Sequence, residues 1–540
     1  MVFQSDIQYR RRRTLLNAGF IAMLFGVLLL GFSDQAFADA TQAKEYLRSA
    51  QTLYKDGQYF KAARYAFSAA QEDRLLRDEA YPWVTLGLIR AGLYHSASYF
   101  FIQTLATKNQ ESIRRVLTRS QDLIEHVGLD LLREHLVTFT SLDDYDSANK
   151  STYLYAMGKK ELLRGNEREA IRYLDQVAPS SSLRPYALMM KGTAHAIIGA
   201  DNQALDDFRD CTKLADAAVD RLESKDSTSG NRWLKQMQKQ AEDLAIRCIA
   251  GEARTLYQMK RYQDADRVYG RIPKQSFVWT DILFEQAWNA FALSEYNRTL
   301  GKLVTYRSPA LGFVFNSEID VLAAQSYLAL CLYEDANKVI NDFNREYGKV
   351  GVEVKRFLES NKRGLVPYYN LGSRVLKEKL HSKDDFNRLL NRFVRGSYFQ
   401  NLVQSEKEIM TEWDAIRKFD SMQSGVSHNL SEGFPGFLQQ VLSWRRKTIE
   451  LLGGAYVKNS LLDYYSQLLS DFEKMSFIKL EMLRRAKEKL ISAGKKDEDE
   501  RSRGSVEPSR RGDQYYWSFN GEFWSDEIGD YVFGLESECR

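Results

Sequence analysis

Residues that could perform acid–base or metal chemistry are few and scattered in this chain. It contains six histidines and four cysteines among 540 residues, which leaves little material for a metal cluster. His126 and His135 lie nine residues apart, so they would not share one helix face, and we expect both to be structural. Glu125 and Asp130 lie near them, but carboxylate pairs are common in a chain with 72 acidic residues. These residues indicate no catalytic site.

The sequence also lacks the motifs of common catalytic sites. It has no Gly-x-x-x-x-Gly-Lys-Ser/Thr phosphate loop, no His-Glu-x-x-His zinc motif and no Gly-x-Ser-x-Gly nucleophile turn. Some periplasmic lytic transglycosylases join a helical solenoid to a lysozyme-like domain with a catalytic Glu followed by Ser. Here Glu536-Ser537 lies four residues from the C-terminus, without room for that domain. We therefore expect no enzyme activity, no metal, no cofactor and no small-molecule substrate.

The composition indicates what kind of fold must position any functional residue. Charged residues make up 27% of the chain and hydrophobic residues 44%, which is ordinary for a soluble protein. With 30 Tyr, 29 Phe and 8 Trp, the chain must form a core. Only 8 prolines occur, which favours uninterrupted helices. The net charge of +4 gives no reason to expect a nucleic-acid partner.

The N-terminal segment (1–38) has the pattern of a secretory signal peptide. Arg10–Arg13 form a basic start, Leu15 to Phe32 carry no charge, and small-x-small sites end at Ala38 and Ala40. We expect cleavage after Ala38 or Ala40 and a periplasmic mature protein. The alternative is an uncleaved anchor, but the unbroken apolar stretch Ala18–Phe32 is shorter than the ~20 residues that a spanning helix needs.

Small and large apolar residues recur at a spacing of about 34 residues, a period that is typical of stacked helix pairs. The first register relates Gly158, Gly165, Ala170 and Leu174 to Gly192, Gly199, Ala204 and Phe208. The second relates Ala253, Tyr262, Ala265 and Tyr269 to Ala287, Tyr296, Thr299 and Leu303. Two independent registers of the same length indicate a repeat of paired helices.

This pattern resembles the tetratricopeptide repeat (TPR), which has a small residue in helix A, a Gly-x-Tyr turn, an Ala early in helix B and a large apolar residue four positions later. Further copies are Ala50/Gly57/Tyr59/Ala62/Ala66, Gly92/Tyr94/Ala97/Phe101 and Ala324/Tyr333/Ala336/Ile340. Lys260, Ser294 and Cys331 replace the turn glycine, and Thr299 replaces the helix-B alanine. The resemblance implies an all-α fold, a TPR-like right-handed superhelical solenoid over most of residues 41–345, in which each large apolar residue plugs the next repeat.

The chain is predicted to have seven parts. They are a signal peptide (1–38), N-terminal TPR-like repeats (39–105), a divergent helical segment (106–150), TPR-like repeats with an insertion near 213–240 (151–345), a C-terminal helical region (346–493), a charged flexible linker (494–514) and an aromatic tail (515–540).

In the C-terminal region, Pro435 indicates a helix start and Gly453-Gly454 a break, followed by a long amphipathic helix over 460–493. Its apolar stripe is typical of a coiled-coil seam or of a hairpin packed on the end of the solenoid. We prefer the hairpin, because an exposed solenoid end needs a cap. The tail is so aromatic that we expect it to dock.

The TPR resemblance implies a concave face that binds protein partners through helix-A side chains. The positions that match are Tyr155, Lys159, Tyr186, Met189, Arg247, Arg254, Tyr257, Phe284, Trp288, Phe291, Glu318 and Gln325. Arg247, Arg254, Tyr257 and Trp288 have the composition of a binding hot spot, and we expect Arg254 and Tyr257 to contribute little to packing. Phe284, Trp288 and Phe291 fit equally well as core between repeats, at spacings of four and three residues.

The repeat register places the cysteines as well. Cys211 falls in helix B of one repeat and Cys248 in helix A of the next, so they are candidate neighbours in an oxidising compartment. Cys331 occupies a turn and Cys539 ends the tail, which suggests a disulfide that latches the tail onto the solenoid. The alternative is that Cys331 is a buried small residue and Cys539 a free thiol.

These patterns together predict a periplasmic scaffold that binds other proteins of the cell envelope. The layout is similar, more weakly, to the TPR-containing gliding-motility and envelope-complex proteins of gliding and predatory bacteria. The residues that carry this likeness are Ala323/Tyr327/Cys331/Tyr333/Asp335-Ala336 and Phe519-Asn520-Gly521-Glu522-Phe523-Trp524. The alternative is a cell-wall factor that binds glycan on the aromatic tail. Partner identity and oligomeric state do not follow from the sequence.

Overall fold

The structure is a computed structural model that describes most of the chain. The described residues are 40–107, 109–226, 232–276, 278–308, 311–378, 384–423, 433–492, 515–516 and 531–539. The predicted signal peptide, the linker at 494–514 and Phe519–Trp524 therefore lie outside the described residues. Among the described helices, none combines the length and the apolar character needed to cross a membrane.

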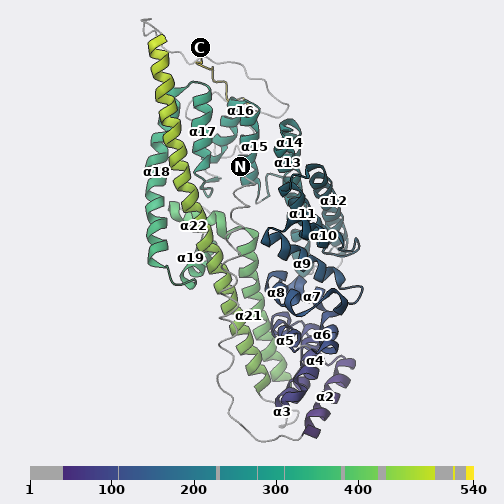
Figure 1. Cartoon of the computed structure of the whole chain (residues 1–540). Helices are drawn as coiled ribbons and strands as arrows, with labels where there is room; N and C mark the ends of the chain where they lie inside the picture. The colour runs from purple at the N-terminus through teal and green to yellow at the C-terminus, as the bar shows by residue number, and fades with distance from the viewer. Residues whose placement is uncertain are drawn as a thin grey trace. The chain divides into compact units, whose positions relative to one another are not determined.

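The chain divides into two compact units. The first comprises Met1–Gly251 with Gln404–Ile449, and the second comprises Glu252–Val403 with Glu450–Arg540. In both units the described residues are almost entirely helical, which confirms the predicted all-α fold. Figure 1 labels the helices and colours them by residue number.

The first unit is built of successive helix pairs followed by two C-terminal helices. Its elements are α2 (Ala40–Lys55), α3 (Tyr59–Glu72), η1 (Arg74–Leu76), α4 (Arg77–Arg90), α5 (Tyr94–Ala106), α6 (Gln110–Leu117), α7 (Ser120–Val127), α8 (Leu129–Phe139), η2 (Leu142–Asp144), α9 (Lys150–Arg164), α10 (Glu167–Asp175), α11 (Arg184–Ile197) and α12 (Asp201–Asp226). It also contains most of α13 (Arg232–Gln258), the end of α21 (Ser397–Gln423) and the start of α22 (Gly433–Ser492).

The second unit continues the helix pairs and ends with a short strand pair. Its further elements are α14 (Tyr262–Tyr269), α15 (Trp279–Ala292), α16 (Tyr296–Val304), η3 (Thr305–Arg307), α17 (Glu318–Ala329), α18 (Tyr333–Ser360), α19 (Val366–Lys377), α20 (Asp385–Val394), β1 (Tyr515–Tyr516) and β2 (Tyr531–Val532). The two strands are parallel, and Tyr515 pairs with Tyr531.

The helix pairs share one turn geometry. One or two residues after the end of helix A the backbone is left-handed, with φ of 77° to 79° at Gly57, Gly92, Gly165 and Gly199 and 58° to 61° at Lys260, Ser294 and Cys331. The next amide then bonds back to the carbonyl five residues earlier. These bonds join Gln58 to Leu53, Leu93 to Leu88, Asn166 to Glu161, Ala200 to His195, Arg261 to Leu256, Glu295 to Ala290 and Leu332 to Tyr327. This Schellman geometry satisfies the end of helix A and starts helix B.

Glycines on helix A allow helix B to approach closely. A Cβ at Gly158 would overlap the Leu174 side chain, and one at Gly192 would lie 3.1 Å from the Phe208 ring. The same ring fills the space above Gly251 on α13, in the next repeat. Phe208 is 2% exposed, so it plugs two successive repeats as the spacing predicted.

In the first unit, the C-terminal helices pack against the helix-B side of the first two pairs. Phe60 stacks on Phe419 with ring centroids 4.7 Å apart, and Phe67 contacts Phe434 at 4.9 Å. Glu412 of α21 accepts hydrogen bonds from the amides of His95 (2.6 Å) and Ser96 (3.0 Å) at the start of α5. This carboxylate satisfies helix amides that would otherwise be buried without a partner.

In the second unit, residues 450–492 of α22 cover the last clear helix pair. Phe472 contacts Phe343 of α18 at 4.9 Å, and Ser317 donates a 2.7 Å hydrogen bond to Asp471, whose side chain is fully buried. Part of the apolar stripe of α22 is therefore used for packing against α17 and α18.

The predicted helix break at Gly453-Gly454 is wrong, because α22 continues through it. The two glycines instead permit close contacts within the second unit. A Cβ at Gly453 would lie 2.6 Å from the Tyr369 ring, and one at Gly454 would collide with the Leu365 carbonyl. Glycine costs helix stability, but here that cost is offset by packing.

Candidate functional site

In the first unit, the predicted groove residues occupy neighbouring helices but differ in accessibility. Tyr155 is 8% exposed, so it belongs to the core, and burial raises the pKa of its hydroxyl far above its usual range. Lys159 forms a 2.8 Å ion pair with Asp130. Tyr186 and Met189 pack partly buried on α11, against the core that contains Phe208 and Cys211.

Arg247 is the exposed member of this set. It lies on α13, close enough to Tyr186 for its charge to lower the pKa of that hydroxyl, which burial raises. Tyr186, Met189 and Arg247 thus form an accessible patch, the helix-A patch, on the helices A of two successive pairs. An arginine beside half-buried aromatic and Met side chains is typical of protein-binding surfaces.

In the second unit, Arg254 has a structural partner. Its guanidinium makes a bidentate contact with Glu285 of α15, with N–O distances of 2.7 and 2.9 Å. Glu285 is 7% exposed and also accepts a 3.0 Å hydrogen bond from Tyr269. The expectation that Arg254 contributes little to packing is therefore wrong, because it neutralises a buried carboxylate between repeats.

The aromatic residues of α15 form a ladder with α16. Trp288 contacts Phe284 at 6.5 Å and Phe291 at 5.7 Å, and Phe291 contacts Tyr296 at 5.3 Å. Phe284 is buried, whereas Trp288 and Phe291 keep part of their surface accessible. Tyr257, also half-buried, instead contacts Tyr262 across the α13–α14 turn. The ladder is thus partly core and partly surface.

The last predicted groove positions lie on α17. Glu318 accepts a 3.2 Å hydrogen bond from Gln467 and lies 3.6 Å from Lys474, both on α22. Burial raises the pKa of its carboxyl, and Lys474 opposes that rise. Glu318 therefore serves helix packing, while Gln325 remains half-buried.

All four cysteines are paired in disulfides. Cys211 is bonded to Cys248, joining α12 to α13 in the first unit, with Cα atoms 6.1 Å apart. Cys331 is bonded to Cys539 in the second unit, with Cα atoms 5.1 Å apart. The second bond joins the α17–α18 turn to the tail.

The tail residues 531–539 lie along α16 and the α17–α18 turn. The Phe533 amide donates to the Asn297 carbonyl at 3.2 Å, and the Asn297 carboxamide bonds both the amide and the carbonyl of Leu535 at 3.0 Å. The Glu538 amide donates to the Leu330 carbonyl at 2.9 Å. Asn297 was missed by sequence reasoning, because one asparagine at a helix start carries no distinctive signal.

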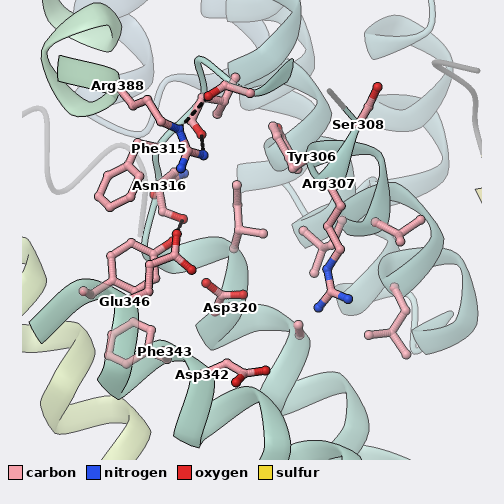
Figure 2. A pocket seen from close by; sticks show the side chains of 18 of the residues that line it. Tyr306, Arg307, Ser308, Phe315, Asn316, Asp320, Asp342, Phe343, Glu346 and Arg388 are labelled. Carbon is pink, nitrogen blue, oxygen red and sulfur yellow. Dashed lines mark hydrogen bonds between the residues drawn. The ribbon is translucent and has the colours of Figure 1, made fainter. Parts of the chain in front are cut away.

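A cavity of about 620 Å³ lies beside the docked tail, between α16, α17 and α18. Figure 2 shows Asp320 and Glu346 facing this space, with Arg307 across from Asp320. Burial raises the pKa of Asp320 to about 6, opposed by a hydrogen bond from Tyr347 and by Arg307. Phe533 of the tail lines the same cavity.

Arg388 of α20 contacts the loop that contains Gly312, Val314 and Phe315, which also lines the cavity. Its guanidinium donates to the carbonyls of Gly312 (2.5 Å) and Val314 (3.4 Å) and lies 5.3 Å from the Phe315 ring centroid. Among the described residues, no three His, Cys, Asp or Glu side chains are grouped as metal ligands. The cavity is lined by both aromatic and acidic side chains, among them Phe315, Phe343, Asp320 and Glu346.

Comparison with known proteins gives likeness only at the level of structure. No protein-family model and no curated protein sequence matches the chain. Among solved structures, it is similar to the TPR domain of P58(IPK), with 16% identity over 56% of this chain and 93% of that chain and a TM-score of 0.18. It is also similar to yeast Tom70, with 11% identity over 84% of this chain and 96% of that chain and a TM-score of 0.19.

These TM-scores are too low to assign the repeat type, which rests on the turns and helix contacts of the chain itself. Seven turns between paired helices have the same left-handed residue, and small residues lie where the helices cross. The chain is a TPR-like helical-repeat protein. Its repeats provide helix surfaces and the cavity beside the docked tail.

Proposed function

We propose that the chain is an exported, periplasmic scaffold that binds other proteins within a cell-envelope complex. The observation that carries the binding role is the helix-A patch, where Arg247 is exposed beside the half-buried Tyr186 and Met189. Such mixed aromatic and cationic surfaces account for most of the binding energy in protein interfaces. The helical repeats hold this patch on rigid elements, so binding requires little ordering of the scaffold.

Two features support the periplasmic location. The sequence before Ala38 has the pattern of a signal peptide, and all four cysteines form disulfides. Disulfides persist in oxidising compartments and are rare in the cytosol. We expect the mature chain to begin at Asp39 or Thr41, which the intact mass of the native protein measures.

The binding role is tested by site-specific photocrosslinking in cells. In one strain a photoreactive amino acid replaces Met189. In a matched control strain it replaces Arg168, which is exposed on α10, the helix B of the preceding pair. We expect discrete crosslinked products from position 189 and none of the same mass from position 168. Equal products at both positions, or none at position 189, would contradict a specific helix-A surface.

The glycan alternative receives no support from the described part of the tail. Tyr531 and Phe533 are each 4% exposed, so these rings offer no open stacking platform for a sugar. We therefore expect the purified protein to stay in solution when it is mixed with isolated sacculi and centrifuged. If the protein pelleted with the sacculi, that result would support the glycan alternative.

A further inference from the structure

The tail segment 531–539 is held on the second unit as an extended peptide is held by a receptor. One side chain, Asn297, contacts the backbone of Leu535 on both its donor and its acceptor, and the Asn297 carbonyl accepts from Phe533. The Leu330 carbonyl accepts from Glu538. All four bonds use backbone groups of the segment, which any extended polypeptide would supply.

The surface under the segment is shaped for a close backbone approach. A Cβ at Gly301 of α16 would collide with the Tyr531 carbonyl, so glycine is required where the segment crosses this helix. Only Tyr531, Val532 and Phe533 of the segment are buried, whereas residues 536–539 are exposed. Side-chain recognition is therefore concentrated at one end, where Phe533 lines the cavity with Asp320 and Glu346.

The two ends of the segment are held differently. Past Phe533 no side chain is buried, and the segment is held by backbone hydrogen bonds, a 3.5 Å bond from the Ser537 hydroxyl to the Leu330 carbonyl and the Cys331–Cys539 disulfide. Each net hydrogen bond contributes modestly in water, so the non-covalent hold past Phe533 is limited. An occupant with better side-chain contacts could replace it in a chain whose Cys331–Cys539 disulfide has not formed.

We propose that Asn297, Gly301 and the Leu330 carbonyl form a second binding site, the tail site, for an extended segment of a partner protein with an aromatic side chain at the position of Phe533. Residues 531–539 occupy the tail site in cis, and the disulfide keeps them there. This inference concerns a different surface from the helix-A patch, so either can fail without the other.

The test uses the full chain and a labelled synthetic peptide of residues 529–538, which lacks Cys539. The cis segment is disabled by Phe533→Asp with Cys539→Ser, and peptide binding is measured by fluorescence anisotropy. We expect no binding to the oxidised wild type and saturable binding to the variant. Adding Asn297→Ala should weaken this binding by about tenfold or more, because two hydrogen bonds to the peptide are lost.

Two controls make the result specific. Asn341→Ala, on an exposed face of α18, should leave peptide binding unchanged. A peptide in which Phe533 is replaced by Ala should bind about tenfold more weakly, since its ring is what the tail site buries. The proposal would be overturned if a folded variant did not bind the peptide. It would also be overturned if neither Asn297→Ala in the protein nor the loss of the aromatic ring from the peptide weakened binding.

A second measurement covers the case in which the double variant does not fold. In the full chain with Cys539→Ser alone, hydrogen exchange is followed at the amides of Phe533, Leu535 and Glu538. A tethered segment has an effective concentration of about millimolar, so several millimolar unlabelled peptide should compete. We expect these amides to exchange several-fold faster with peptide present. Unchanged protection would mean that the segment is a fixed part of the fold.

Discussion

The two units build the same turn from different residues. In the first unit, the left-handed position is glycine at Gly57, Gly92, Gly165 and Gly199. In the second unit it is Lys260, Ser294 and Cys331. A residue with a Cβ is roughly 1–2 kcal/mol less favourable in this conformation. The second unit therefore gives up turn stability at each of these pairs.

The difference continues in the packing between helices. The first unit uses Gly158, Gly192 and Gly251 to let large apolar side chains fill the space between repeats. Both units contain buried polar bonds, such as the His95 amide with Glu412 in the first unit and Arg254 with Glu285 in the second. The second unit also bonds Cys331, a turn residue, to the tail. This contrast teaches that the left-handed turn does not require glycine, and that at Cys331 the residue in its place also forms a covalent bond.

The largest expected effect comes from restoring glycine at the turn that carries the disulfide. Cys331→Gly should relax the left-handed turn but remove a bond between positions separated by 208 residues. Chain-entropy arguments give about 5 kcal/mol for such a loop, and the glycine returns about 1 kcal/mol. We expect a net loss of about 4 kcal/mol in the free energy of unfolding of the second unit, measured by denaturant titration.

The matched variant is Cys539→Ser, which removes the same disulfide but keeps Cys331 at the turn. It should be less stable than Cys331→Gly by about 1 kcal/mol, the contribution of the turn alone. If the two variants are equally stable, the left-handed residue at position 331 imposes no strain.

The next effect concerns the buried ion pair of the second unit. Arg254→Ala leaves the buried Glu285 carboxylate without its main partner. Because the arginine side chain is 35% exposed and water reaches the site, we expect a loss of about 2 kcal/mol in the free energy of unfolding. Arg267→Ala, in an exposed pair with Asp264, is the control and should change stability by less than about 0.5 kcal/mol. Equal losses would mean that Glu285 is well solvated.

The cavity of the second unit adds a pH dependence that can be isolated. The pKa of Asp320 is raised to about 6, so its contribution to stability is present below the unfolded pKa near 3.8 and is lost as pH rises through about 6. Asp320→Asn should flatten this fall between pH 4 and 6 and stabilise the protein by about 1–2 kcal/mol at pH 7. Thermal melts across this range measure it, and an unchanged pH profile would show that Asp320 is not desolvated.

The smallest effects test the turns themselves. Ser294→Gly should stabilise the second unit by about 0.5–1 kcal/mol, whereas Gly165→Ala should destabilise the first by about 1 kcal/mol. Opposite signs in the melting temperature are expected. If both substitutions destabilise the protein, the claim that Ser294 strains its turn is contradicted.

The repeat could be predicted from the sequence, but the hydrogen bonds and ion pairs between side chains could not. The spacing of Gly192 and Phe208 predicted a close helix crossing, because the repeat register fixes which residues meet. The helix through Gly453-Gly454 was mispredicted, because only the opposing Tyr369 and Leu365 reveal why glycine is there.

The candidate site was less predictable for the same reason. Arg254 matches the helix-A register, but its pairing with Glu285 depends on the angle between α13 and α15, which the register does not encode. The roles of Asn297 and of the cavity near Asp320 depend on where the tail docks, and the tail lies far along the chain from both. Helix periodicity carries no information about a contact between such distant segments.

The central claim is that an exported helical-repeat protein holds its own tail through Cys331. Non-reducing peptide mapping of the protein purified from the periplasm tests it most directly, after free thiols are blocked by alkylation. We predict two linked peptide pairs, Cys211 with Cys248 and Cys331 with Cys539, and no alkylated cysteine. Recovery of Cys539 as an alkylated free thiol, with Cys331 also unpaired, would contradict the account.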